Sequence, residues 1–312
     1  MTTDPVMRQY TRRVTQIGFF VLFLIAPLMD WLRFDLNEAQ LWFLDQRWTL
    51  GIDALRQGQA TPMDAALGIM TRGIVPGVVF VVTFMAVAYR FGRLYCGWLC
   101  PHFSMVETLN TLMHKASGKF SFWDKSKTPH ATRQPNAAWW LGFVLLSMAC
   151  ASLWAITLLT YLLPPAEIWH NLLNGNLTPN QTRFLSIATA AFTVEFVFAR
   201  HLFCRFGCAV GLFQSLAWMA NDRAMVVSFD RDRAKECLTC DAPRGSACDH
   251  GCPMRLHPRN IKRMMFSCVQ CGRCLNACEN SHSHFGTTPS LQWHIGVDAV
   301  RETLRSRRQE LH

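Results

Sequence analysis

The stretch "FGRLYCGWLCPHF", residues 91–103, decides the fold, because it ends an apolar run with two cysteines and a proline. A weaker copy, "FARHLFCRFGCAVG", ends another apolar run at residues 198–211. Both copies carry the spacing Cys-x-x-x-Cys, in Cys96 with Cys100 and in Cys204 with Cys208. The same spacing at equivalent positions favours a metal or redox role over the packing of these cysteines as small apolar side chains.

The spacing also predicts local structure. Residues four apart in a helix share a face, so we expect each cysteine pair to lie on one helical turn. Pro101 suits the first position of a new helix, whereas Ala209 stands at the equivalent place in the second copy and predicts that this copy differs from the first. Four thiols are expected to converge, and a third iron–sulfur cluster, copper and a reversible dithiol are the alternatives for what they hold.

The composition indicates a membrane protein. Hydrophobic residues make up 50% of the 312 positions and charged residues 17%, and the chain has 11 tryptophans. A chain this apolar differs from an ordinary soluble domain. Four uncharged or nearly uncharged runs are candidate membrane spans, at residues 14–29, 73–89, 137–163 and 184–199.

The distribution of Lys and Arg predicts the orientation, since short cytoplasmic loops are enriched in these residues. The N-terminal segment and the loop 90–136 are rich in them, whereas the loop 164–183 is nearly uncharged and the loop 30–72 mixes acidic residues with arginines. We therefore expect a multi-pass protein of the bacterial inner membrane, in contact with the lipid bilayer, whose two termini and cysteine-rich region are cytoplasmic.

The cysteine-rich region is the strongest signal in the chain. "CVQCGRCLNAC", at 268–278, has the Cys-x2-Cys-x2-Cys-x3-Cys spacing of a bacterial ferredoxin, and "CLTCDAPRGSACDHGCP", at 237–253, has the same run with five extra residues before its third cysteine. In such pairs the fourth cysteine of each run binds the cluster of the other run. The predicted ligands are Cys237, Cys240, Cys248 and Cys278 for one 4Fe-4S cluster and Cys268, Cys271, Cys274 and Cys252 for the other.

Competing interpretations of these eight cysteines are weaker. Zinc sites use two separate Cys-x2-Cys pairs, so a third cysteine three residues later is superfluous to a tetrahedral ion. Disulfides do not suit a cytoplasmic face, where thiols stay reduced. The net charge of +10 follows mostly from the positive-inside bias, and no aromatic and basic motif favours nucleic acid.

The expected fold is a mainly α membrane protein with about four transmembrane helices in two repeated hairpins, followed by a ferredoxin domain with two clusters. The expected domains are a first hairpin with its cytoplasmic loop, a second hairpin, the ferredoxin domain and a polar tail, at residues 1–136, 137–228, 229–281 and 282–312. The tail contains a predicted short amphipathic helix over 297–311.

The order of these features resembles the membrane-bound polyferredoxins, a superfamily that includes the NapH, NosR and CcoG or FixG proteins. The resemblance covers roughly residues 14–280 and rests on "CGWLCP" after one span, a second Cys-x-x-x-Cys after a later span, and the paired ferredoxin runs. The linker before the first run and "CGWLCPHFSMVE" are most similar to the CcoG branch, the accessory proteins of cytochrome oxidase. Ala209 in place of the usual proline and the lack of that branch's C-terminal domain are departures.

This resemblance implies transfer of single electrons between a membrane or cytoplasmic donor, such as quinol, and a respiratory or maturation partner protein. The alternative is an assembly factor that reduces copper(II) to copper(I) for a haem–copper oxidase or another copper enzyme, with the paired motifs binding copper. A third class is a scaffold whose clusters only stabilise a docking domain.

Two further features leave alternatives open. Glu195 lies inside the fourth predicted span, where an acid serves either a proton path or quinol site, or an ion pair with a neighbouring cation such as Arg200. His282 and His284 are either metal ligands or solvated loop residues.

Overall fold

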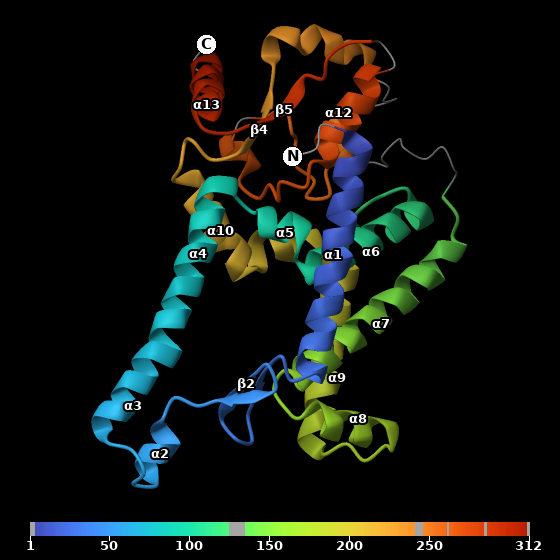
Figure 1. The fold of residues 1–312 in the computed structure, drawn as a ribbon. Coiled ribbons are helices and arrows are strands. Elements are labelled where there is room, and N and C mark those ends of the chain that lie inside the picture. The colour runs from blue at the N-terminus through green and yellow to red at the C-terminus, as the bar shows by residue number, and fades with distance from the viewer. Residues whose placement is uncertain (1–3, 125–134, 241–245, 261, 284–285, 311–312) are drawn as a thin grey trace. The chain divides into compact units, whose positions relative to one another are not determined.

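The computed structural model describes residues 4–124, 135–240, 246–260, 262–283 and 286–310. Over these residues the chain is mainly helical, as predicted (Figure 1). The α-helices are α1 (Pro5–Leu28), α2 (Ile52–Arg56), α3 (Pro62–Gly68), α4 (Val75–Phe91), α5 (Leu94–Trp98), α6 (Pro101–Ser117), α7 (Ala138–Thr160), α8 (Pro165–Leu173), α9 (Pro179–Val194), α10 (Ala209–Met219), α11 (Ala247–Gly251), α12 (Arg273–Ser283) and α13 (Val297–Glu310).

Four of the described helical segments are long and apolar enough to cross a membrane, which confirms the predicted number of spans. They are Pro5–Leu28, Pro62–Phe91, Ala138–Thr160 and Pro179–Ala199. The first begins well before the predicted residue 14, because Arg8 and Arg12 in its first turns are buried and paired with Glu279 and Glu107. The second span is longer than the predicted 73–89 because the π-helical segment Ile69–Ile74 joins α3 to α4 without a break.

The chain divides into two compact units that do not follow chain order. The first unit contains residues 1–20, 85–147 and 195–312, and the second contains residues 21–84 and 148–194. All twelve cysteines with a predicted ligand role belong to the first unit. The division into four consecutive domains stays a prediction.

The second unit contains a small antiparallel sheet that the sequence analysis treated as loop. Its strands, in order, are β1 (Leu32–Asp35), β2 (Gln40–Phe43) and β3 (Gln46–Trp48). Arg33 is buried, bonded to Asp35 at 2.7 Å and stacked over Trp42. The alternation of apolar and polar residues in "LRFD" was the available signal.

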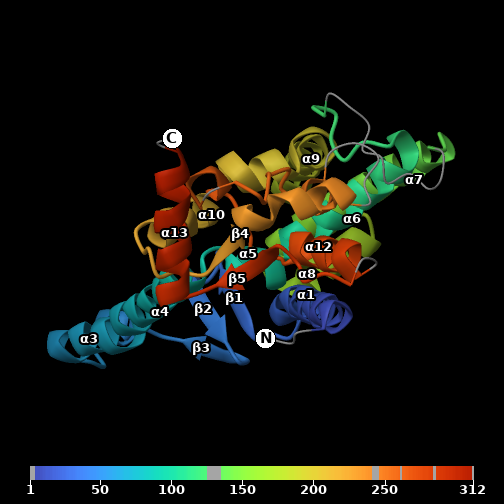
Figure 2. The same cartoon turned by 90° about the horizontal axis from the view of Figure 1, so that it is seen from above.

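In the first unit, two strands frame the cysteine-rich region. Strand β4 (Val226–Phe229) precedes the first cysteine run, and strand β5 (Leu291–His294) follows the second; they pair antiparallel and lie side by side in Figure 2. Helix α12 packs against α11 and β5. The predicted C-terminal helix is confirmed as α13 up to Glu310, and residue 311 lies outside the described residues.

Candidate functional site

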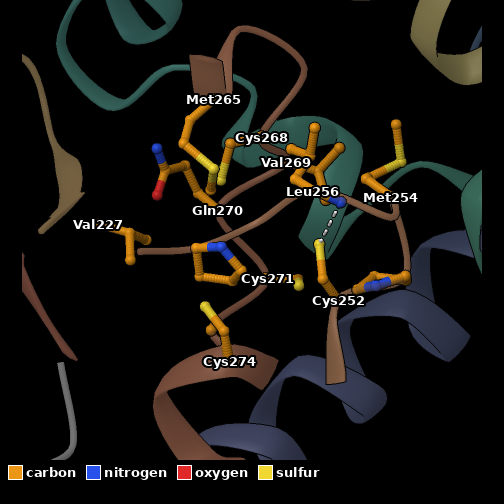
Figure 3. Close-up of a pocket in the computed structure, with 13 residues that line it drawn as sticks. Val227, Cys252, Met254, Leu256, Met265, Cys268, Val269, Gln270, Cys271 and Cys274 are labelled. Atoms are coloured by element: carbon orange, nitrogen blue, oxygen red, sulfur yellow. Dashed lines mark hydrogen bonds between the residues drawn. The ribbon is translucent and has the colours of Figure 1, made fainter. Parts of the chain in front are cut away.

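The first group of cysteines surrounds one cavity. Cys252, Cys268, Cys271 and Cys274 line this small cavity together with apolar side chains such as Met254 (Figure 3). These are the four cysteines that the spacing assigns to one cluster. The structure therefore brings together one cysteine from the first run and three from the second.

The backbone around this cavity suits an anionic group. Gln270 and Gly272 both have left-handed conformations, with φ of 52° and 70°, so the chain turns tightly between the cysteines. The backbone N–H of Leu256 donates to the sulfur of Cys252 at 3.4 Å, drawn as a dashed line in Figure 3. Successive N–H groups in such turns bind anions, and N–H bonds to cysteine sulfur are typical of iron–sulfur sites. The residues present thus fit a 4Fe-4S cluster.

The second group consists of Cys237, Cys240, Cys248 and Cys278. Burial raises the pKa of the Cys278 thiol, and the nearby thiols of Cys237 and Cys240 raise it further. Burial also raises the pKa of Cys248 to about 12, with Cys278 contributing. The N–H of Ala247 donates to the sulfur of Cys240 at 3.4 Å. The five extra residues of this run, 241–245, lie outside the described residues.

The third group joins the two Cys-x-x-x-Cys motifs. Burial raises the pKa of Cys100 to about 12, and the thiols of Cys96 and Cys208 contribute. The pKa of Cys204 is also raised, by burial first and then by Cys100, Glu195 and Cys96. The four thiols predicted to converge are therefore neighbours.

A turn encloses each motif, but it is wider than an α-helical one, because the N–H of Cys100 donates to the backbone oxygen of Tyr95 at 3.0 Å and that of Cys208 to the backbone oxygen of Phe203 at 2.9 Å. Cys96 lies in α5, but the chain leaves the helix at Leu99 and Cys100 caps α6 with an extended ψ of 118°. Pro101 explains this break, because a residue before proline avoids the helical region. Cys208 caps α10 in the same way, with ψ of 108°, although no proline follows it. The second copy differs instead in its preceding segment, which is π-helical from Phe203 to Gly207.

Among the described residues, no three His, Cys, Asp or Glu side chains lie close enough to hold a single metal ion. A cluster of four irons has a looser requirement, since each of its cysteines binds a different iron and the ligand sulfurs lie farther apart than around one ion.

Arg93 is a buried cation beside the third group that the sequence analysis counted only as a loop charge. It is 1% exposed, donates to the backbone oxygen of Cys204 at 2.5 Å, and lowers the otherwise burial-raised pKa of Cys96. Among the described residues no carboxylate forms an ion pair with it. A buried cation needs a counter-charge. Burial keeps these thiols neutral on their own, so they supply that charge only as thiolates that bind a metal.

A hydrogen-bonded chain leads from the fourth span to the third group. Glu195 Oε2 lies 3.0 Å from His102 Nε2, and His102 Nδ1 lies 3.5 Å from the sulfur of Cys204. Arg200, which the sequence offered as the partner of Glu195, donates instead to the backbone oxygen of Phe120 at 3.1 Å. The position of His102, directly after Cys100 and Pro101, was the feature of the sequence that could have identified it as a candidate site residue.

The third group packs directly on the first. Trp98 Nε1 donates to the backbone oxygen of Gln270 at 3.0 Å. Gly97 lies against Val269, where a Cβ atom would come within 2.1 Å of the Val269 backbone oxygen. One buried apolar cluster contains or touches cysteines of both groups, namely Cys96, Cys100, Cys204, Cys252, Cys268 and Cys271.

The first and second groups are also adjacent. Cys274 and Cys248 lie in one buried cluster with Cys278 and Leu275. Burial raises the pKa of Cys274, and Cys248 is among the thiols that raise it further. The first group therefore packs against both the second group and the third.

Of His282 and His284, which follow the last cysteine, His282 lies within the described residues. His282 is buried and lies 2.6 Å from Thr287 Oγ1, so the solvated interpretation is wrong for it. His284 lies outside the described residues.

Comparisons with known proteins give one family match and two relatives. The model of a 4Fe-4S binding domain matches residues 74–119 and 181–223, the two stretches that carry the Cys-x-x-x-Cys motifs. The chain is 24% identical over 225 residues to an uncharacterized protein of Methanocaldococcus jannaschii, covering 70% of this chain and 84% of that protein. It is 20% identical over 212 residues to the "Putative electron transport protein YccM" of Escherichia coli, covering 64% of this chain and 53% of that protein.

The chain thus spans about half the length of the Escherichia coli relative. No solved structure matches it. Together with its four apolar helices, the match identifies a membrane-type protein that carries a 4Fe-4S binding domain.

Proposed function

We propose that this protein is a membrane-anchored carrier of single electrons with three 4Fe-4S clusters, one for each group of four cysteines. The contiguous packing of the three groups carries the proposal. The name of the Escherichia coli relative and the match of a 4Fe-4S binding domain to the third group support it. The proposed order is the second group, then the first, then the third.

A 4Fe-4S cluster supplies reversible one-electron reduction when bound. The protein's own part is to hold the thiolates in place and to exclude water from them. Cys271, Cys274 and Cys204 are each less than a tenth exposed. Arg93 balances negative charge at the third group, and backbone N–H groups bond to sulfur at the other two. These interactions are the means by which a protein sets a cluster's reduction potential.

We place the three groups on the cytoplasmic side of a bacterial inner membrane, on the distribution of Lys and Arg. Electrons enter from a membrane donor such as quinol or from a cytoplasmic reductant, and leave to a redox partner protein.

Anaerobic reconstitution tests the number of clusters. The protein is expected to bind iron and sulfide for three clusters and to show reducible 4Fe-4S signals in electron paramagnetic resonance. The double variant Cys96→Ser with Cys204→Ser should retain iron for two clusters, because only the third group loses ligands. Cys150→Ser is the matched control and should retain all three. An unchanged iron content in the double variant would overturn the third cluster.

The copper alternative, which follows the CcoG branch, makes the opposite prediction for the same variants. If the third group handled copper, the wild type would bind copper(I) and reduce copper(II), and the double variant would lose both while keeping its full iron content. This result would replace the electron-carrier proposal for the third group and leave it intact for the other eight cysteines.

His102 should tune the cluster proposed at the third group. A hydrogen bond from its ring to the sulfur of Cys204 stabilises the more negative, reduced state and raises the reduction potential. His102→Leu is therefore expected to lower the potential of one signal in a redox titration, and His102→Gln, which retains a donor, should restore part of the shift. Equal potentials in the two variants would exclude the hydrogen bond as the cause.

A further inference from the structure

Helix α10 has its polar and apolar faces reversed relative to a helix in water. Each strongly exposed side chain of its first two turns is apolar, and its polar side chains face the protein. The exposed residues are Val210, Leu212, Phe213 and Leu216, and the buried ones are Gly211, Gln214, Ser215 and Trp218. A soluble amphipathic helix shows the opposite arrangement.

Specific contacts fix this orientation. The sulfur of Cys96 lies 3.7 Å from Gln214 Oε1, and Ser215 Oγ donates to the backbone oxygen of Phe266 at 2.8 Å. Trp218 Nε1 donates to the backbone oxygen of Met225, also at 2.8 Å. A rotation of α10 that hid its apolar face would break all three contacts. The apolar face therefore stays outward.

The exposed apolar surface continues along the chain toward a candidate membrane span. Phe206 is 70% exposed, and Phe198, in the last turn of the span Pro179–Ala199, is 51% exposed. After α10 the sequence becomes polar at once, with Asn221, Asp222 and Arg223. Exposed apolar side chains thus recur along the chain from the last turn of a span to the end of α10.

We propose that the outer face of α10 lies in the lipid bilayer. A helix can enter lipid because it satisfies its own backbone hydrogen bonds, and a side lined only by aliphatic and phenylalanine side chains is the kind that inserts at the membrane boundary. The residues just before this face along the chain, from Phe206 to Cys208, are uncharged, and charged residues follow only after its end, whereas the apolar centre of a specific protein interface is surrounded by a polar rim. The occupant is therefore lipid rather than a second copy of the chain.

This placement has a consequence that rests on the proposed electron transfer. Gln214 of α10 contacts Cys96, so the third group lies on the protein side of a helix whose other side contacts lipid. A helix with its side chains is about 10–12 Å across. A donor dissolved in the bilayer then reaches the third group more closely than either of the other two groups.

Photo-crosslinking of the full chain in vesicles of phosphatidylethanolamine and phosphatidylglycerol tests the placement. The photoreactive residue p-benzoyl-phenylalanine replaces Phe213 in one variant and His257 in the control; His257 lies in the loop after Cys252 and is strongly exposed. Phe213 is an exposed aromatic position, so the replacement should leave the fold intact, and bound iron verifies it in each variant.

A lipid adduct at position 213 and none at position 257 is the expected result. A crosslinked dimer at position 213, or equal lipid labelling at both positions, would overturn the proposal. This experiment measures the mass of the adduct and not electron transfer. Its failure can therefore be distinguished from a failure of the proposed three clusters.

Discussion

Replacing Gly97 with alanine is expected to separate the first Cys-x-x-x-Cys motif from the ferredoxin loop and to destabilise the protein by about 1–3 kcal/mol. The added Cβ would lie 2.1 Å from the backbone oxygen of Val269 and 3.2 Å from its carbonyl carbon. Backbone atoms cannot swing aside as a long side chain does, so the loop from Cys268 to Cys271 must shift as a whole. That loop carries two of the proposed ligands.

The measurements are the thermal midpoint and the iron content of the purified protein in detergent. Gly18→Ala is the matched control, because Gly18 lies in helix α1 and a Cβ there meets no other atom within 4 Å. Removing a helical glycine stabilises by roughly 0.5–1 kcal/mol, so this control should melt at or slightly above the wild type. A Gly97→Ala protein with the midpoint and iron content of the control would show that the two loops do not touch.

The grouping of the cysteines illustrates what sequence reasoning could reach. The spacing of the eight ferredoxin-type cysteines assigned Cys252, from the first run, to the cluster of the second run, and the structure places it at the same cavity as Cys268, Cys271 and Cys274. Such grouping is predictable because loop length alone limits which thiols can meet. The four spans were predictable for a similar reason, since hydropathy acts locally along the chain.

Contacts between distant segments were not predictable from local patterns. Arg93 was taken as a topology signal, yet its side chain lies beside Cys204, more than a hundred residues away. His102 was likewise linked to Glu195 only by the fold. The width of the turn within each motif was not predictable either, since Cys100 and Cys208 both adopt an extended ψ although a proline follows only the first of them. Strands β4 and β5 pair with each other although both cysteine runs lie between them in the chain, so no short stretch of sequence contains both strands.

Glu107 should be the most sensitive charged residue of the first unit. Its carboxylate is 4% exposed and binds Arg12 through both oxygens, at 2.7 and 2.9 Å, and Arg273 at 2.7 Å. These bonds join α1, α6 and the second cysteine run. Glu107→Ala leaves the buried Arg12 guanidinium without its counter-ion, which costs about 3–5 kcal/mol of the free energy of unfolding. Thermal or denaturant unfolding of the purified protein measures the loss.

A matched control separates burial from charge pairing as such. Glu38 also pairs with an arginine, Arg47, but both side chains are exposed, so Glu38→Ala should cost about 1 kcal/mol or less. Equal losses in the two variants would contradict the argument, since exposed and buried pairs would then contribute alike.

The pH dependence gives an independent check on the same carboxylate. Burial alone would raise the pKa of Glu107, but the hydrogen bonds and charge of Arg12, together with Arg273, lower it from 4.5 to about 2. A lowered pKa means that the unfolded chain takes up the proton first, so the stabilisation is complete above pH 4.5 and is lost as the pH falls toward 2. The difference in stability between the wild type and Glu107→Gln should therefore be constant from pH 7 to about 5 and shrink only below it. A difference that already shrinks near pH 6 would mean that Glu107 is not held by the two arginines in the folded protein.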